Sequence, residues 1–310
     1  MRHLTRRSII NHVSAHAVRI AFCLAAGWTL TASAHAPPPS SPPTTAPATQ
    51  PQTTAPQNLP PAKQIIEASQ AALGDPKVVN DVSSISSKAT LHGPMGDVNF
   101  DLKTTRNGAF FLKQSLSNQP GFESTVCYDG KIGWMVGPDG SAKLVDEATL
   151  EQGRQQFRML FPFWLVLHPT ENFQSFETVD RVQYAGEDCY KVRLFSENEP
   201  DIQRFGYYDT DDSTIRGIGV VQESPMGPVN VDFVFSDWKE FDGVKMFTVM
   251  NVEQMGQQLK VDYTEIAFNK VDPSVFEPPP QVQELLKPKP AETQPQPAPP
   301  PATAPENSGG

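Results

Sequence analysis

Few residues of this chain have the types and spacing that catalysis or metal binding requires. Beyond residue 34 the sequence holds three histidines, His35, His92 and His168, and two cysteines, Cys127 and Cys189. A His/Cys metal site needs three or four converging ligands, and a Ser-His-Asp relay needs a histidine base. His92 lies in a Leu-His-Gly-Pro segment typical of a turn, and His168 ends an apolar run. We therefore expect no metal site and no cofactor.

Carboxylates are the remaining catalytic resource, because the chain holds 35 of them. No CxxC, HExxH, GxGxxG, P-loop or GxSxG motif occurs, so the common metal, nucleotide and nucleophile signatures are missing. The densest acidic group, residues 209–214, has the composition of a solvated hairpin turn; a cation or acid/base site is the alternative. We predict that the protein is not an enzyme, and keep a carboxylate-dependent hydrolase as an alternative.

The two cysteines beyond residue 34 leave two interpretations open. If the chain is exported, Cys127 and Cys189 could pair across a long loop, which loop entropy alone makes worth ~4 kcal/mol when the geometry allows it. Two buried free thiols are the other interpretation. The sequence does not distinguish them.

The first 34 residues have the features of a cleaved export signal. Four arginines supply positive charge, and no carboxylate is present. An apolar stretch over residues 20–30 follows and ends in small residues, which fits cleavage after Ala34. That stretch is too short for a normal membrane span. We expect a location in the periplasm or outside the cell, reached by the general or the twin-arginine route, with an uncleaved anchor as the alternative.

Two proline-rich segments, residues 35–61 and 281–310, flank the middle of the chain. Sequence of this kind buries too little apolar surface to offset its ordering entropy, so we predict disordered, extended tethers. Without the export segment, 21 basic and 35 acidic residues remain, a net charge of −14. Such an acidic chain repels phosphate backbones, and we expect no nucleic-acid partner.

The remaining segment, residues 62–280, is predicted to form one domain built mainly from β-strands. Apolar and polar residues alternate in repeated short runs, which is typical of strands with one apolar and one solvated face. Such runs occur at residues 98–103, 190–194, 229–235 and 259–263. Asn-Gly and Asp-Gly pairs between the runs favour tight turns, and tight turns join antiparallel neighbours. The pairs lie at 107–108, 129–130, 139–140 and 242–243.

Two segments have helical spacing instead. The first is Ala62 to Leu73, with Gly74 as its stop, and the second is the long interruption from Asp146 to Leu167. Residues 160–167 are the most apolar stretch beyond the export segment, and Pro162 should break or kink a helix there. This stretch is either a plug packed against the sheet or a movable lid that contacts lipid or a partner. The fold class is α+β, mainly β: a curved antiparallel sheet with helices covering its concave face.

Several segments, taken in order, resemble the LolA/LolB-like family, in particular exported outer-membrane lipoprotein-sorting proteins. The resemblance covers about residues 63–280. It rests on five segments, Lys103-Thr-Thr-Arg-Asn-Gly-Ala-Phe110, Tyr128-Asp-Gly-Lys-Ile-Gly-Trp134, Glu223-Ser-Pro-Met-Gly227, Ser236-Asp-Trp-Lys-Glu-Phe-Asp-Gly-Val-Lys245 and Val271-Asp-Pro-Ser-Val-Phe-Glu-Pro278. The resemblance implies an unclosed half-barrel whose helices act as a lid over a hydrophobic cavity for acyl chains.

The resemblance also implies roles for particular residues. Arg106 lies where these carriers place an arginine that helps to close the lid, although Thr105 precedes it and Asn107 replaces the family's proline. Arg106 is therefore either a lid latch or an ordinary turn arginine. The residues expected to line the cavity are Phe100, Leu102, Phe110, Leu112, Trp134, Phe161, Trp164, Phe233 and Met246.

Two functions follow from these expectations. The first is a carrier or chaperone that holds a lipid, a lipoprotein acyl chain or another apolar ligand and works by burial of apolar surface. Outer-membrane lipoprotein sorting is one process in which such a carrier acts. The second is a sensor or protein-interaction module of the cell envelope with the same fold, which the long tethers favour because tethers position a domain. The fold alone does not choose between them.

Overall fold

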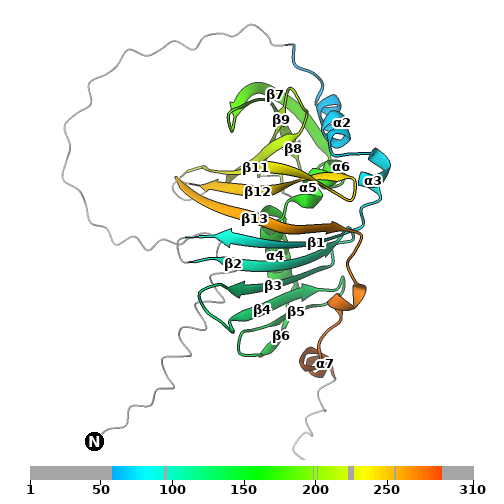
Figure 1. The fold of residues 1–310 in the computed structure, drawn as a ribbon, viewed down its shortest axis with the longest axis vertical. Helices are drawn as coiled ribbons and strands as arrows, with labels where there is room; N and C mark the ends of the chain where they lie inside the picture. Colours follow the sequence, from blue (N-terminus) through cyan, green and yellow to red (C-terminus); the bar gives the residue numbers. More distant parts are fainter. Residues whose placement is uncertain are drawn as a thin grey trace, which may run out of the picture.

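The computed structural model describes residues 58–93, 96–197, 199–200, 202–222, 227–254 and 256–287. The predicted export signal, nearly all of the first tether and the end of the second lie outside the described residues. One antiparallel sheet of 13 strands dominates (Figure 1), in the order β6-β5-β4-β3-β2-β1-β13-β12-β11-β10-β9-β8-β7. The edge strands β6 and β7 do not pair with each other, so the sheet is open. The predicted architecture, mainly β and unclosed, is confirmed.

The sheet consists of two meanders that meet in its middle. The first runs from the centre to one edge as β1 (Ser84–His92), β2 (Val98–Thr105), β3 (Phe110–Leu116), β4 (Glu123–Tyr128), β5 (Gly133–Val136) and β6 (Ala142–Val145). The second runs from the other edge back to the centre as β7 (Ser175–Tyr184), β8 (Glu187–Phe195), β9 (Gln203–Asp209), β10 (Ile215–Gln222), β11 (Val229–Phe241), β12 (Val244–Gln254) and β13 (Gln257–Phe268). Pairing of β1 with β13 joins them.

The tight turns follow their sequence signals. Gly108 has φ 90° and Asp242 has φ 51°, values in the left-handed region that glycine and aspartate accept at low cost. The acidic segment between β9 and β10 is a hairpin turn: the Asp209 carboxylate accepts N–H bonds from Asp211 at 2.7 Å and from Asp212 at 3.1 Å. Within the described residues no group of three or more His, Cys, Asp or Glu side chains could hold a metal ion.

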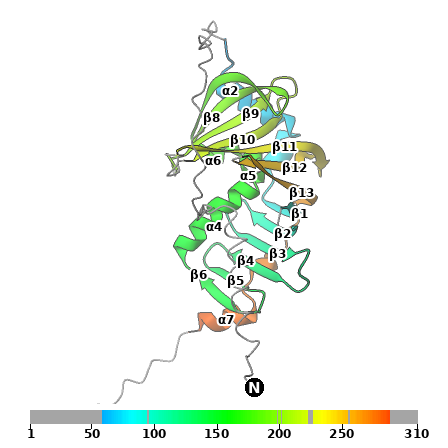
Figure 2. The same cartoon turned by 90° about the vertical axis from the view of Figure 1, so that its left-hand side faces the viewer.

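The connection from β6 to β7 must cross the whole sheet, because these strands are its opposite edges. It does so as three helices, α4 (Glu147–Leu160), α5 (Phe163–Leu167) and α6 (Pro169–Asn172). Figure 2 shows α4 running obliquely across one face of the first meander, with α5 and α6 following under the second. The Asp146 carboxylate caps α4 by accepting the N–H of Thr149 at 2.9 Å. The helix ends before Pro162, as predicted.

Two N-terminal helices close the same side of the sheet. α2 (Ala62–Ala72) buries Ile65, Ile66 and Ser69, and α3 (Pro76–Asn80) follows it. Gly74 joins them at φ 140°, and a Cβ there would lie 2.3 Å from the carbonyl oxygen of Gly243. Only glycine allows the chain to come this close to the β11–β12 turn. The predicted first helix is confirmed.

The C-terminal segment covers the opposite, convex face beside β6 (Figure 1). A short 3₁₀ helix, η1 (Pro273–Phe276), is followed by α7 (Pro280–Leu286). Folded structure therefore continues beyond residue 280, where the sequence prediction placed the start of a tether. The reason is Val282, which is fully buried against Trp134 and Phe276. None of the helices in the described part of the chain combines the length and apolar character that a membrane crossing needs.

Candidate functional site

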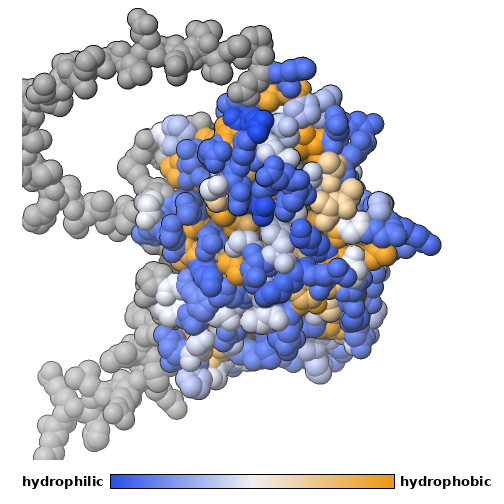
Figure 3. All heavy atoms as spheres, turned by 45° about the horizontal axis from the view of Figure 1, so that its top comes forward, coloured by the Kyte–Doolittle hydropathy of each residue, from blue (hydrophilic) through white to orange (hydrophobic). Residues whose placement is uncertain are grey.

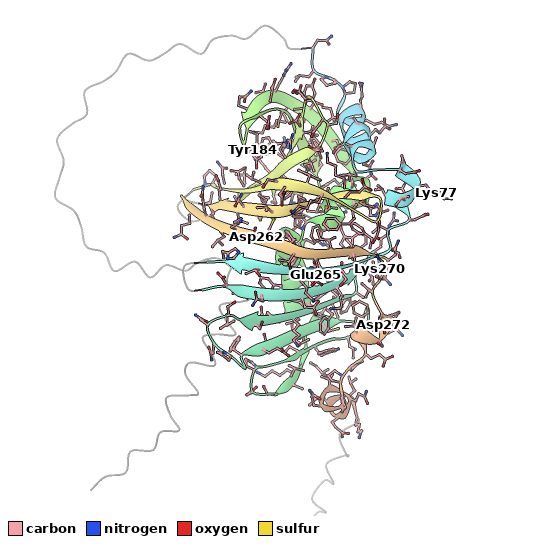
Figure 4. The ribbon with its side chains drawn as sticks, viewed as in Figure 1. Lys77, Tyr184, Asp262, Glu265, Lys270 and Asp272 are labelled. Carbon is pink, nitrogen blue, oxygen red and sulfur yellow. The ribbon has the colours of Figure 1, made fainter. Side chains whose placement is uncertain are left out.

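The concave face of the sheet brings together eight of the nine residues predicted to line a cavity. Five of them are buried in the main core cluster, namely Phe100, Leu102, Phe161, Phe233 and Met246, and Leu112 and Trp164 pack against it half-buried. Phe110 adjoins this cluster through the ring of Phe157, with centroids 4.9 Å apart. Figure 4 shows side chains from helices and strands crowding the space between them. These residues contact one another.

Trp134 lies apart from the other eight. It is paired with Cys127 and Leu144 in the sheet and packs against Phe276 and Val282 on the convex face. Its neighbour Gly133 faces the concave side instead. Successive side chains of a strand point to opposite faces of the sheet, so Trp134 points to the convex face because its neighbour Gly133 faces the concave one. The aromatic type of Trp134 suggested a cavity residue, but its strand position decides otherwise.

Cys127 and Cys189 are both buried free thiols. They lie on β4 and β8, which eight other strands separate in the sheet order. A disulfide requires Cα atoms about 4.4–6.8 Å apart. The disulfide that the sequence left open is absent, and two buried thiols is the interpretation that holds.

The segment that crosses the concave face has two parts with different contacts. We call α5 and α6 the plug and α4 the cover. In the plug, the Phe163 ring is 1% exposed and packs between Phe247 at 5.3 Å and Tyr263 at 4.8 Å, measured between ring centroids. Leu167 is fully buried. The plug is thus part of the hydrophobic core, as one of the two predicted interpretations held.

The cover is a more polar helix, and three of its described side chains contact the sheet. Eight of its 14 residues are polar or charged. Phe157 stacks on Phe110 of β3, and Leu150 fills the space above Gly133 of β5, where a Cβ would lie 2.8 Å from the Leu150 Cγ. Arg154 lies over the Tyr128 ring of β4 at 4.3 Å. Polar helices of this kind gain less from burial than the plug does.

Arg106 fastens the plug to the sheet. From the β2–β3 turn, its Nε donates to the Glu171 carboxylate at 3.1 Å and its Nη2 donates to the second oxygen of the same carboxylate. Its Nη1 donates to the carbonyl of Asn80 at 2.7 Å. The hydrogen bond to Glu171 raises the pKa of Arg106, and the same bond lowers the pKa of Glu171. Arg106 therefore bridges the sheet, α3 and α6, rather than serving the turn alone.

A second polar contact lies beside this one. Trp164 Nε1 donates to Thr104 Oγ1 on β2 at 3.0 Å, and the Trp164 ring stacks on His168 with centroids 5.7 Å apart. His168 is 3% exposed, and within the described part of the chain its Nε2 has no hydrogen-bond partner. Burial lowers the pKa of His168, and the charge of Arg106 lowers it further, while Glu171 and the Val82 backbone oppose them. A neutral imidazole suits this place.

A shallow depression of about 160 Å³ adjoins the Arg106 contact. It is lined by Glu67, Gln70, Ala71, Pro76, Val79 and Asn80, from α2 and α3. Asn80 connects it to Arg106, and Gln70 Nε2 donates to the carbonyl of Leu167 in the plug at 3.4 Å. On the face that Figure 3 brings forward, hydrophobic residues are scattered among hydrophilic ones. The depression therefore adjoins residues that hold Arg106 and the plug in place.

Sequence reasoning missed several residues of this site. Arg106 pairs with Glu171, 65 positions away, and Trp164 pairs with Thr104, 60 positions away. Nothing in the sequence links residues so far apart. Phe247 follows Met246 directly, so strict alternation assigns it to the other face, yet both are fully buried. The apolar run of residues 160–167 did suggest a buried plug, with a movable lid as the alternative.

Comparison with known proteins gives a likeness of fold. No family model matches the chain, and no curated protein sequence matches it. Among solved structures, the chain is similar to a LolA superfamily protein from Nitrosomonas europaea (11% identity, 71% of this chain and 99% of that one, TM-score 0.48). It is also similar to a DUF1329 family protein from Desulfovibrio piger (13% identity, 70% and 97%, TM-score 0.47). A third is an outer membrane lipoprotein-sorting protein domain from Vibrio parahaemolyticus (11% identity, 69% and 97%, TM-score 0.43).

Two of these structures belong to the family that the sequence segments resemble. Identities of 11–13% and TM-scores below 0.5 assign no function to this chain. A function for this chain has to be inferred from the residues of the concave face and of the segment that crosses it.

Proposed function

We propose that this protein is a non-enzymatic, exported carrier or chaperone that binds the apolar chain of a lipid or lipoprotein on the concave face of its open sheet. The proposal rests on one observation: the two parts of the segment that crosses the concave face are held to the sheet by different contacts. The plug is anchored in the core by aromatic packing and by Arg106, whereas the cover rests on the apolar strands β3, β4 and β5 through Phe157, Leu150 and Arg154.

Binding would exchange one apolar partner for another. As the cover swings away about Phe161 and Pro162, an acyl chain takes the place of Phe157 and Leu150 against the strands. Each methylene removed from water contributes about 0.8 kcal/mol. The side chains of the cover lose their contacts in return, so only a chain long enough to exceed this cost binds. The plug stays in place and keeps the sheet folded while the cover is open.

Native mass spectrometry with lipid extraction tests this function. The protein, expressed with its own N-terminus and purified from the periplasm without detergent, should carry a bound mass that is released as an acyl lipid. Protein stripped of lipid should regain such a mass when fatty acids are added. A mass of the bare chain that ignores every added lipid would contradict the proposal.

A sensor or protein-interaction module of the cell envelope is the second candidate, and the depression between α2 and α3 favours it. A side chain of a partner protein seated there would touch Asn80 and Gln70, both of which hold parts of the Arg106 and plug contacts. A stable partner that co-purifies with the chain, and is lost when Ala71→Glu fills the depression with charge, would favour this function over the carrier.

A further inference from the structure

Arg204 is a buried cation on the apolar face of the sheet. Its side chain is 8% exposed, and it lies near the start of β9. It pairs with Leu194 of β8 and Val220 of β10, both of which belong to the main core cluster. Paired residues on antiparallel neighbours point to the same face, so the guanidinium lies on the concave face among apolar side chains. Burying a cation there is costly unless it is paired and fully hydrogen-bonded.

The pairing of Arg204 is incomplete. Its Nη2 donates to Glu199 at 2.6 Å, but its Nη1 is buried and has no hydrogen-bond partner among the described residues. Arg216, one strand away on β10, shows the contrast. Its Nε donates to Asp209 at 2.9 Å and its Nη2 lies 2.8 Å from Asp209 and 3.3 Å from Asp212. A buried donor without an acceptor is rare in native proteins and calls for an explanation.

The charge of a second cation, Arg158, also acts on Arg204. Burial lowers the pKa of Arg204, Glu199 raises it, and the positive charge of Arg158 lowers it again. Arg158 is an exposed residue in the last turn of the cover, next to its junction with the plug, and the structure shows no ion pair for it within the described residues. The charges of the two guanidinium groups oppose each other, and an anion bound to Arg204 would relieve this repulsion.

We propose that Arg204, assisted by Arg158, binds the anionic head group of an amphiphile whose apolar chain lies along the concave face. This inference rests on the proposed carrier function and names the class of its ligand: a single-chain amphiphile with a carboxylate or phosphate head group. The head group oxygen accepts the hydrogen bond of Arg204 Nη1, while Glu199 keeps Nη2. Bonds between a guanidinium and an oxyanion are among the stronger ones in proteins, and the apolar surroundings exclude competing water.

The test compares ligands that share a chain and differ in the head group. Binding of oleic acid, oleyl phosphate and oleyl alcohol is measured by displacement of a fluorescent lipid probe at pH 8, below their aggregation concentrations, with inorganic phosphate as a chain-free anion. The wild-type protein should bind both anionic ligands at least about tenfold more tightly than the alcohol, as expected for one charge-assisted hydrogen bond. Inorganic phosphate alone should not displace the probe.

The variants separate the head group from the chain. The double variant Arg204→Gln/Glu199→Gln removes the pair without changing the net charge, and should lose the preference for the acid while still binding the alcohol. Arg158→Gln should lower the preference in part. Arg193→Gln is the matched control, because Arg193 lies on the neighbouring strand β8, faces away from Leu194 and contacts Phe195 at 4.8 Å. It should change nothing.

The outcomes distinguish the two proposals. If the wild type binds the acid and the alcohol equally, or if the double variant keeps the preference, the Arg204 site is overturned and the carrier function stands. If inorganic phosphate displaces the probe as well as the acid does, the site binds soluble anions and the amphiphile is overturned. If no chain-bearing ligand binds, both proposals are overturned.

Discussion

The plug and the cover are consecutive in the chain and cross the same face of one sheet, but different kinds of contact hold them there. The plug, Phe163–Asn172, contributes fully buried side chains to the core and is fastened by Arg106 and Trp164. The cover, Glu147–Leu160, is mostly polar, and the described side chains that contact the strands include Phe157 and Arg154. This difference is the basis of the proposal that the plug is a fixed anchor and that the cover can be displaced by a ligand.

The largest expected effect is a difference in stability between substitutions of two phenylalanines, one in the plug and one in the cover. Phe163→Ala should lower the free energy of unfolding by about 3–5 kcal/mol, because a fully buried ring leaves a cavity. Phe157→Ala should cost about 1–2 kcal/mol, since its ring is only half-buried. Urea denaturation of both variants measures this. Equal losses would remove the distinction between plug and cover.

Arg106→Gln should loosen the plug by a smaller amount. The Arg106 and Glu171 side chains are 35% and 47% exposed, so solvent screens their ion pair and the loss should be about 0.5–1 kcal/mol. A double-mutant cycle with Glu171→Gln isolates the pair from other effects. Hydrogen exchange should rise in residues 163–172 and remain unchanged in residues 147–157. Faster exchange in the cover instead would make Arg106 a latch of the cover.

Acidification should weaken the plug through His168. Its pKa in the folded protein is lowered from the usual 6.5, mainly by burial and further by Arg106. The unfolded chain therefore takes up a proton first as the pH falls. Its contribution to stability is complete above about pH 6.5 and is lost progressively below it. In urea denaturation from pH 8 to pH 5, His168→Gln should show a flatter decline than the wild type, and an identical decline would contradict this assignment.

The smallest effect concerns the reactivity of the two thiols. Each thiol lies in a different meander, so its reaction measures how readily that meander opens. Burial raises the pKa of both Cys127 and Cys189 to about 12, so neither should react with an aromatic disulfide reagent at pH 8 in the native protein. In urea below the unfolding transition, Cys127 of β4, in the meander under the cover, should react before Cys189 of β8. Simultaneous labelling would show that the two meanders open as one unit.

The sequence predicted the repetitive parts of the fold well and the site only in part. Alternating runs predicted strands such as β2, β8, β11 and β13, since period-2 patterning is a local property. The break at Pro162 and the first helix were local signals as well. The strands β1, β7 and β10 lack a clean alternation, and β7 is an edge strand exposed along much of its length.

The missing parts of the site depend on distant contacts. Arg106 was identified by a family resemblance, but its partner Glu171 is 65 positions away and follows only from the path of the crossing segment. Trp134 was assigned to the wrong face because its aromatic character outweighed its strand position. Val282 and α7 lie in a proline-rich context, yet burial of one valine beside Trp134 is enough to order that helix. Composition does not reveal such contacts.

The central claim is that the cover moves and the plug does not, and a reversible crosslink tests it most directly. Gly133 of β5 and Leu150 of the cover lie close enough for a disulfide, because a Cβ on Gly133 would be 2.8 Å from the Leu150 Cγ. The variant Gly133→Cys/Leu150→Cys, oxidised and stripped of lipid, should take up no fluorescent fatty acid, and should regain uptake after reduction, whereas each single variant binds throughout. Undiminished uptake by the oxidised protein would show that the ligand does not enter beneath the cover and would contradict the account.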